Sequence, residues 1–246
     1  MSEKYLVEKV YSNKKIDEDI YEISIKGKFE GLPGQFYMLR GWDREPTLSR
    51  PISINNIDED KITFLYRVFG RGTEILSKLK VDDEIKITGP LGNGFDIEKI
   101  KGNIAIVAGG IGIAPMRYLI NKLEGCNIDL HVGFRNKSRT VDNVEKNVNN
   151  FYLSTENGDA GHKGYVTDLL KVENYDMVLC CGPEIMMTKV VEMCRDKKVT
   201  VYVSMENRMA CGIGACLVCT CKTKSGRKRS CKEGPVFLGE ELVING

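Results

Sequence analysis

The sequence predicts a β plus α/β fold: an antiparallel barrel, then a doubly wound domain on a parallel sheet, then a small cysteine-rich module. In residues 1–97, short alternating runs are separated by turn residues, which is typical of a barrel. From about residue 100, continuously apolar runs alternate with helix-like segments, which is typical of a sheet buried on both faces. The end of the chain carries five of the nine cysteines. We therefore expect boundaries that give domains 1–98, 99–204 and 205–246.

The composition is that of an ordinary globular protein. Apolar residues make up 42% and charged residues 28% of the 246, and the formal net charge of +2 gives no field that would attract nucleic acid. Residues 1–10 lack the apolar stretch of a secretory signal, and the most apolar run, 104–116, is too short and too broken by glycine to span a membrane. Many cysteines without a signal fit a reducing compartment, so we expect a cytoplasmic protein that binds neither nucleic acid nor membrane.

The barrel elements follow from alternation and turn residues. Strands are expected over residues 21–25, 34–39, 52–54, 62–68 and 84–88. One short helix is expected over residues 73–79, with Thr73 as its N-cap and Glu74 in its first turn.

The α/β elements follow from apolar runs and helix signals. Strands are expected over residues 104–108, 128–134, 177–181 and 199–203. Helices are expected over residues 115–124, from Asp168 after a Thr167 cap, and from the Gly182-Pro183 turn to about residue 197. In such a domain, ligands bind in the crevice at the carboxyl ends of the strands.

Two segments of the barrel domain suit an anion. Arg50-Pro-Ile-Ser53 opens a strand with a cation and a hydroxyl, and Gly70-Arg-Gly72-Thr73 stands where the short helix starts. Free N–H groups at a helix start attract anions, so one pyrophosphate would be gripped from both sides. Tyr66 and Arg67 lie on the strand between these segments, where they would flank a flat ring system. A solvated arginine and plain barrel core explain the same residues without a ligand.

The α/β domain has a second candidate for binding phosphate. Gly109-Gly-Ile-Gly112 joins a buried strand to a helix, and Cys181-Gly-Pro183 ends a later strand at the same edge of the sheet. A tight turn without a ligand accounts equally well for the glycines. We expect no catalytic nucleophile, because no histidine can be placed beside Cys181.

The cysteines near the end have the spacing of an iron–sulfur site. Cys211, Cys216 and Cys219 form a C-x4-C-x2-C pattern with Cys231 downstream, which is the plant-type arrangement for a [2Fe–2S] cluster. A four-cysteine zinc site usually has two C-x-x-C pairs, and only one is present; disulfides need an oxidising compartment. Cys221 is a fifth thiol that competes for four places. We also expect the apolar Leu217-Val218 pair to shield the cluster from water.

A basic segment lies between the third and fourth of these cysteines. It has five cations and no acid, and Ser225-Gly226 suits the turn of a hairpin. The cations are Lys222, Lys224, Arg227, Lys228 and Arg229. A solvated hairpin is the simpler interpretation, and a surface for an acidic partner is the other.

Together, these motifs resemble the ferredoxin–NADP reductase superfamily, which pairs a flavin-binding barrel with a nicotinamide-binding α/β domain. RPIS with GRGT is similar to its flavin signature, and GGIGIAP with CGP is similar to its nicotinamide signature. GPLGNGF at 89–95 and MENRMACGIGACLVCTCK at 205–222, followed by Cys231, resemble the electron-transfer subunits of type B, NAD-dependent dihydroorotate dehydrogenases. The resemblance covers nearly the whole chain.

The resemblance implies three cofactors: FAD on the barrel, NAD on the α/β domain and a [2Fe–2S] cluster on the last module. The implied FAD contacts are Arg50, Pro51, Ile52, Ser53, Leu65, Tyr66, Arg67, Gly72 and Thr73. The implied NAD contacts are Gly109, Gly110, Gly112, Cys181, Gly182 and Pro183. The implied cluster ligands are Cys211, Cys216, Cys219 and Cys231. The chain departs from the superfamily at Ile52, where an aromatic residue is frequent.

The resemblance also implies an oxidoreductase subunit of pyrimidine biosynthesis. Electrons would pass from an FMN-containing catalytic subunit to the cluster, to FAD and to NAD+, in a heterotetramer with two of each subunit. A reductase subunit of a hydrogenase or of a ferredoxin-dependent transhydrogenase would keep the same motifs, and a zinc-stapled binding module is an alternative of another class. NADP also stays open, because Arg135 and Arg139 follow the second α/β strand, where a 2′-phosphate is recognised.

Overall fold

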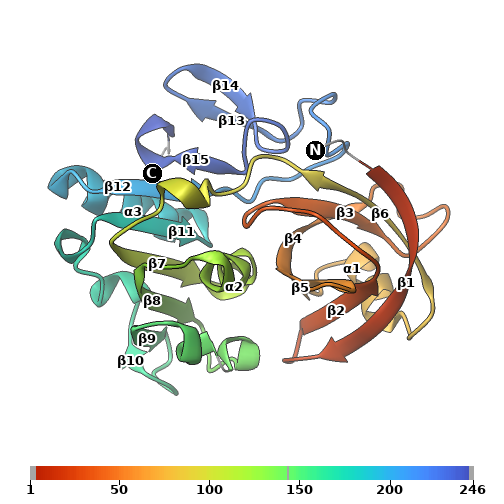
Figure 1. The fold of residues 1–246 in the computed structure, drawn as a ribbon, viewed down its shortest axis with the longest axis horizontal. Coiled ribbons are helices and arrows are strands. Elements are labelled where there is room, and N and C mark those ends of the chain that lie inside the picture. The colour runs from red at the N-terminus through yellow and green to blue at the C-terminus, as the bar shows by residue number, and fades with distance from the viewer. Residues whose placement is uncertain (1–3, 143, 244–246) are drawn as a thin grey trace.

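The structure, a computed structural model, describes residues 4–142 and 144–243. Figure 1 shows three parts side by side: a barrel in red to yellow, an α/β domain in green to light blue, and a small blue module over the junction between them. The barrel is closed and antiparallel, in the order β1-β2-β5-β4-β3-β6. The predicted fold class is confirmed.

The barrel has six strands among the described residues. They are β1 (Lys4–Lys15), β2 (Ile20–Lys26), β3 (Phe36–Arg40), β4 (Arg50–Ile57), β5 (Lys61–Arg67) and β6 (Glu84–Leu91). Successive side chains of β5 point to opposite faces of the barrel wall. Ile62, Phe64 and Tyr66 lie in the barrel core, whereas Leu65 packs against the core of the α/β domain. Leu65 therefore belongs to the domain junction and not to the barrel interior.

The short helix of the barrel begins earlier than predicted. Helix α1 spans Arg71–Lys78 and its N-cap is Gly70, so the prediction that Thr73 caps the helix is wrong. Thr73 lies in the first turn instead. Its hydroxyl accepts a hydrogen bond from the Phe69 N–H at 2.7 Å and donates one to the Gly70 carbonyl at 3.0 Å. This hydroxyl ties the start of the helix to the end of the preceding strand.

The α/β domain is built on a seven-stranded sheet in the order β10-β9-β8-β7-β11-β12-β15. Its strands are β7 (Asn103–Gly109), β8 (Asn127–Phe134), β9 (Asn150–Thr155), β10 (His162–Lys163), β11 (Met177–Cys181), β12 (Thr200–Ser204) and β15 (Val236–Leu238). Helices α2 (Ile113–Lys122) and α3 (Glu184–Lys197) pack on opposite faces of it. The order of the strands reverses between β7 and β11, which makes this the topological switch point where ligands bind.

Three features of this domain differ from expectation. The helix predicted from Asp168 is only a 3-10 turn, so that prediction is wrong. Strands β9 and β10 were not predicted, because they are short and carry little apolar periodicity. Strand β15 comes from the last segment and pairs antiparallel with β12, so the cysteine-rich module contributes an edge strand to the sheet. The 3-10 turns are η1 (Ile97–Lys99), η2 (Gly110–Gly112), η3 (Arg139–Val141), η4 (Val144–Asn147), η5 (Val166–Asp168), η6 (Val172–Asn174) and η7 (Gly239–Glu241).

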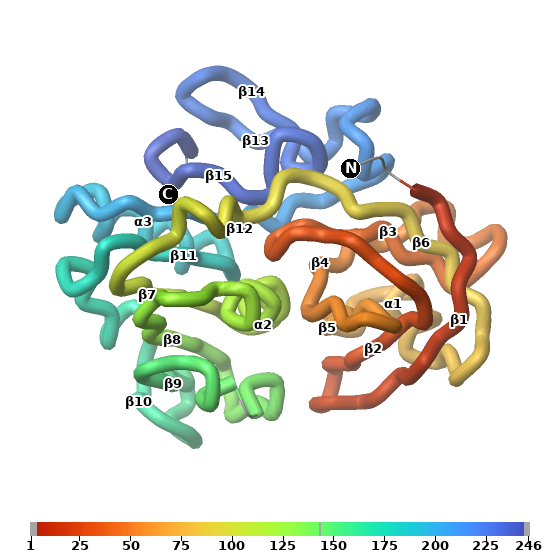
Figure 2. Tube along the Cα trace, viewed as in Figure 1, coloured from red at the N-terminus to blue at the C-terminus, as the bar shows by residue number. Residues whose placement is uncertain are grey.

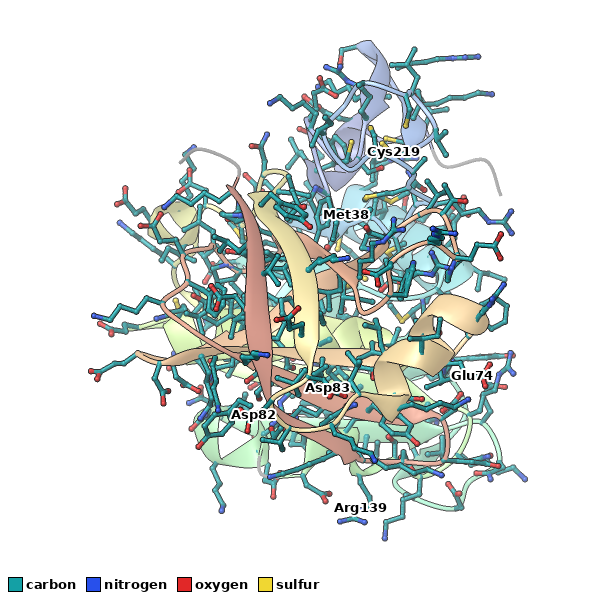
Figure 3. All side chains as sticks on the ribbon, turned by 90° about the vertical axis from the view of Figure 1, so that its right-hand side faces the viewer. Met38, Glu74, Asp82, Asp83, Arg139 and Cys219 are labelled. Atoms are coloured by element: carbon teal, nitrogen blue, oxygen red, sulfur yellow. The ribbon has the colours of Figure 1, made fainter. Side chains whose placement is uncertain are left out.

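The last module contains the predicted hairpin, formed by β13 (Thr220–Thr223) and β14 (Gly226–Arg229). The trace in Figure 2 runs from β12 across the top of the barrel before it reaches the hairpin. Buried side chains join the two parts there: Phe36, Met38 and Leu91 of the barrel pack with Cys219 and Cys231. Figure 3 shows Met38 and Cys219 at this junction, among the sulfur atoms of the module. In residues 4–142 and 144–243, no helix is long and apolar enough to cross a membrane.

Candidate cofactor-binding sites

Arg50 lies against the first turn of α1. A Cβ atom placed on Gly72 would come within 2.5–2.7 Å of the Arg50 guanidinium, so the glycine leaves the space that this side chain fills. The first N–H groups of a helix have no partner within the helix and attract anions. A positive side chain and the N–H end of α1 therefore lie together, as a pyrophosphate site requires. Burial lowers the pKa of the Arg50 guanidinium, which nevertheless stays charged.

The other predicted FAD residues of the barrel lie around this point with different exposures. Pro51, Ile52 and Ser53 are half-buried at the start of β4. The ring of Tyr66 is only 1% exposed and lies inside the barrel, so it cannot flank a cofactor ring at the surface. Arg67 faces outward and forms an ion pair with Asp19 at 3.0 Å.

The two loops predicted for the nicotinamide lie at neighbouring strand ends, since Cys181 of β11 is in register with Ala108 of β7. They are pressed together: a Cβ on Gly112 would collide with the Cys181 carbonyl, and one on Gly182 would come within 2.8 Å of the Gly109 nitrogen. Gly110 is different, because its φ is +53° and nothing lies within 4 Å of its Cβ position. This open glycine leaves room for a phosphate to approach the backbone closely.

Sequence reasoning missed a carboxyl group at the same place, that of the exposed Glu206. Glu206 Oε1 lies 3.9 Å from the thiol of Cys181. Desolvation by the surrounding protein raises the pKa of Glu206, while the thiol and the charge of Arg67 oppose this effect. Burial also raises the pKa of Cys181. The available signal was position: Glu206 comes two residues after β12, at the sheet edge where β7 and β11 end.

The four predicted cluster cysteines form two pairs. The thiols of Cys219 and Cys231 are 3.2 Å apart and buried. The N–H of Cys216 donates to the Cys211 sulfur at 3.4 Å, and Cys216 is exposed. Two pairs of thiolates suit a binuclear cluster, in which each iron takes two protein ligands. Within the described residues, no three His, Cys, Asp or Glu side chains gather around one metal-ion position.

The loop around Cys211 favours a thiolate. Burial alone would raise the pKa of Cys211, but backbone N–H groups from Cys216, Ile213 and Ala215, together with the Cys216 thiol, lower it to about 6. Such donors are also the groups that stabilise iron-bound sulfur. A Cβ on Gly212, whose φ is +76°, would come within 2.8 Å of Met38, so the glycine lets the loop pack closely on the barrel. These residues fit an iron–sulfur cluster.

Cys221 points away from the two pairs. Its thiol donates to the Lys228 carbonyl at 3.3 Å, and its side chain packs against the core beside α3. The expectation that Leu217 and Val218 shield the cluster is wrong, since they are 62% and 56% exposed. Ile213 is also exposed, so three apolar side chains close to Cys216 in the sequence face solvent. These three residues are called the apolar rim below.

Comparisons with known proteins agree with this arrangement. Residues 206–243 match the iron–sulfur cluster binding domain of dihydroorotate dehydrogenase B. The dihydroorotate dehydrogenase B (NAD(+)) electron transfer subunit of Clostridium acetobutylicum is 68% identical, with 100% of both chains covered. The Clostridium perfringens protein of the same name is 48% identical over 98% of this chain and 99% of its own. The chain belongs to this family of electron transfer subunits.

A solved structure extends the comparison beyond this electron-transfer-subunit family. The chain is similar to an NADH-dependent reduced ferredoxin–NADP oxidoreductase, with 31% identity, a TM-score of 0.86, and coverage of 96% of this chain and 90% of that one. A ferredoxin reductase of carbazole 1,9a-dioxygenase shares the fold, with 19% identity and a TM-score of 0.67 over 81% of this chain and 67% of that one. The predicted superfamily fold is thereby confirmed.

Two arginines were considered for a 2′-phosphate: Arg135 is exposed, and Arg139 lies beside carboxylates. The backbone N–H of Arg139 donates to Asp17 of the barrel at 3.1 Å, and its side chain lies 3.8 Å from Asp142. Arg139 therefore lies between two carboxylates, which would oppose a phosphate. Figure 3 shows it at the end of the molecule far from Cys219.

Proposed function

We propose that the chain transfers electrons between a dihydroorotate-oxidising catalytic subunit and NAD+, as an oxidoreductase subunit of pyrimidine biosynthesis. Oxidation of dihydroorotate releases two electrons and two protons; NAD+ takes up both electrons and one proton as a hydride, and the other proton goes to solvent. The observation that carries the proposal is the packing of Cys219 and Cys231 directly on barrel residues Phe36, Met38 and Leu91. A one-electron centre and a flavin barrel that touch are what this reaction needs.

Three groups supply the chemistry when bound: NAD exchanges hydride, the [2Fe–2S] cluster exchanges single electrons, and FAD can exchange both. The residues of the chain hold and orient them. We assign Arg50, Gly72 and Thr73, with the neighbouring β4 and β5 backbone, to the FAD pyrophosphate. We assign Gly110 and the Cys181-Gly-Pro183 turn to NAD, and the two cysteine pairs to the cluster. The close packing of Gly109, Gly112 and Gly182 keeps both NAD loops fixed at the switch point.

The apolar rim and the hairpin suit the docking of a partner. Ile213, Leu217 and Val218 are exposed and lie within three residues of the exposed Cys216 in the sequence, so a partner that covers this segment would remove water from the cluster. Of the hairpin cations, Lys228 pairs with Glu241 at 3.1 Å and Arg229 pairs with Glu233, so both act within the module. Lys222, Lys224 and Arg227 are left for an acidic partner surface. We propose an FMN-containing catalytic subunit as the partner, in a heterotetramer with two of each.

NAD is the favoured dinucleotide, and dihydroorotate the favoured electron source. The names of the relatives specify NAD(+), and Asp17 and Asp142 beside Arg139 disfavour an additional phosphate. The relation to a ferredoxin–NADP oxidoreductase keeps a transhydrogenase subunit as the second candidate, but its identity is 31% against 68% for the dihydroorotate dehydrogenase subunit.

The test separates the lone chain from the complex. The reconstituted chain alone should bleach its flavin absorbance with NADH and pass electrons to an artificial acceptor, but it should not oxidise dihydroorotate. Dihydroorotate-dependent NAD+ reduction should appear when the catalytic subunit is added, and should vanish in a Cys219→Ser chain. Dihydroorotate turnover by the lone chain would contradict the subunit role. A colourless chain containing zinc would favour a zinc-stapled binding module, and light scattering of the complex would test the stoichiometry.

A further inference from the structure

Arg40 is surrounded by main-chain carbonyl groups of a single loop, residues 41–49, which joins β3 to β4. Its guanidinium donates to the carbonyls of Trp42 at 3.0 Å, Asp43 at 2.5 Å, Arg44 at 3.1 Å and Thr47 at 2.7 Å. Four of its five N–H donors are thus used on one loop. Arginine can do this because its donors form a rigid planar fork, whereas a lysine ammonium is a single point.

The loop that Arg40 organises holds Arg50. Trp42 donates its indole N–H to the Pro46 carbonyl at 2.5 Å, which fixes its ring within the loop. The Arg50 guanidinium lies 5.6 Å from the centroid of that ring and donates to the Leu48 carbonyl at 2.5 Å. Arg40 lies 5.9 Å from the same centroid. Both the ring and the carbonyl that position Arg50 therefore come from the loop that Arg40 holds together.

Two ion pairs fix the outside of the loop. Asp43 pairs with Lys86 of β6 at 2.5 Å, and Glu45 pairs with Arg71 of α1 at 3.0 Å. Asp43, Glu45 and Arg71 are largely exposed, so these contacts contribute little stability on their own. Arg40, in contrast, is half-buried and makes four hydrogen bonds to the loop main chain. The order of loop 41–49 thus depends mainly on one side chain.

We propose that Arg40 is a positioning residue for FAD: it shapes loop 41–49 so that Trp42 and Leu48 hold the Arg50 guanidinium against the start of α1. The inference rests on the proposed FAD site at Arg50. Without Arg40, the four carbonyls must turn to water and the loop loses its fixed shape. Arg50 then has to be ordered when FAD binds, and that cost lowers affinity.

The experiment uses the full chain, and Trp42 is its only tryptophan, so fluorescence reports on the loop directly. FAD is titrated into the deflavinated wild type, Arg40→Lys, Arg40→Ala and Arg50→Ala, and both flavin absorbance and Trp42 emission are followed. Arg195→Ala, which removes an exposed arginine of α3, is the matched control. Arg40→Lys should weaken FAD binding at least about tenfold and make Trp42 more accessible to iodide, although the charge is kept. Cluster absorption and the melting temperature of the FAD-free chain should match those of the control.

The outcomes are separable. Wild-type affinity in Arg40→Lys would overturn the proposal, because a charge without the fork would then suffice. The same holds if weak binding in Arg40→Lys comes with a lost cluster or a lower melting temperature, since the effect would then be on the whole fold. Wild-type affinity in Arg50→Ala would contradict the FAD site itself. Weak binding in Arg50→Ala with an unaffected Arg40→Lys would contradict only the role of Arg40.

Discussion

The carboxyl group of Glu206 lies 3.9 Å from the thiol of Cys181. Cys181 is buried, whereas Glu206 is exposed beside it. Cys181 ends a strand of the α/β domain, and Glu206 begins the segment that leads to the cysteine module. The charge of Arg67, from the barrel, also acts on Glu206. The Glu206 carboxyl group therefore lies where the three parts of the chain meet.

Stability should fall with rising pH because of Glu206. Desolvation by the surrounding protein raises its pKa in the folded chain above the ordinary 4.5, so the unfolded chain releases this proton first as pH rises. The stabilising contribution is full below pH 4.5 and is lost as pH rises through the raised folded pKa. Glu206→Gln cannot ionise. Its melting temperature should therefore gain on that of the wild type as pH rises above 4.5, and the gain should be small because Glu206 is exposed and solvent screens its charge.

Glu192→Gln is the matched control for this comparison, since Glu192 is exposed on α3. Its melting curve should parallel that of the wild type at every pH. If the difference between Glu206→Gln and the wild type were constant with pH, the carboxyl group would not be titrating in this range.

Cysteine replacements should separate the two pairs from the fifth thiol. Serine at Cys211, Cys216, Cys219 or Cys231 should abolish or strongly alter the cluster absorption and its electron paramagnetic resonance signal, because a ligand is lost. Cys221→Ser should leave both signals and the iron content unchanged, since that thiol packs toward α3. Loss of the cluster in Cys221→Ser, with retention in Cys219→Ser, would show that the pairing has been assigned wrongly.

Gly72→Ala should weaken FAD binding while leaving the fold intact. The new methyl group would meet the far end of the Arg50 side chain, which can rotate away if it gives up its contacts with Leu48 and Trp42. Alanine also favours α1 over glycine by about 0.5–1 kcal/mol, so the chain should be no less stable. We expect an FAD dissociation constant at least about tenfold higher, from the loss of one charged contact. Unchanged affinity with a displaced Arg50 would argue that the pyrophosphate lies elsewhere.

Two glycines of one loop should respond in opposite ways. Gly112→Ala sets a methyl group against the Cys181 carbonyl, a backbone atom that cannot move away, so we expect a marked fall in melting temperature. Gly110→Ala meets nothing within 4 Å and costs only about 1–2 kcal/mol for its positive φ, but its methyl group occupies the space left for a phosphate. It should raise the KM for NADH with FAD content unchanged. An unaltered KM would contradict the NAD site at Gly110.

The sequence by itself determined the fold class and most of its elements. Helix α3 and strand β11 lie where glycine, proline and apolar runs predicted them, because these signals act locally along the chain. The cysteine spacing likewise indicated a binuclear cluster, since three of the four thiols come from one short loop. At Thr73 a local signal was misinterpreted: its hydroxyl accepts a hydrogen bond from Phe69, and α1 begins two residues earlier after Gly70.

Only the tertiary structure decided which groups from distant segments meet. Glu206 and Cys181 are 25 residues apart and touch because two neighbouring strands end at the same edge of the sheet. Arg40 and loop 41–49 carry no recognisable motif, yet four carbonyls converge on one guanidinium because a loop folds back on the strand before it. Tyr66 is buried and Leu217 is exposed. Burial depends on which distant segments pack against a residue, and the residue pattern along one strand or loop does not reveal those segments.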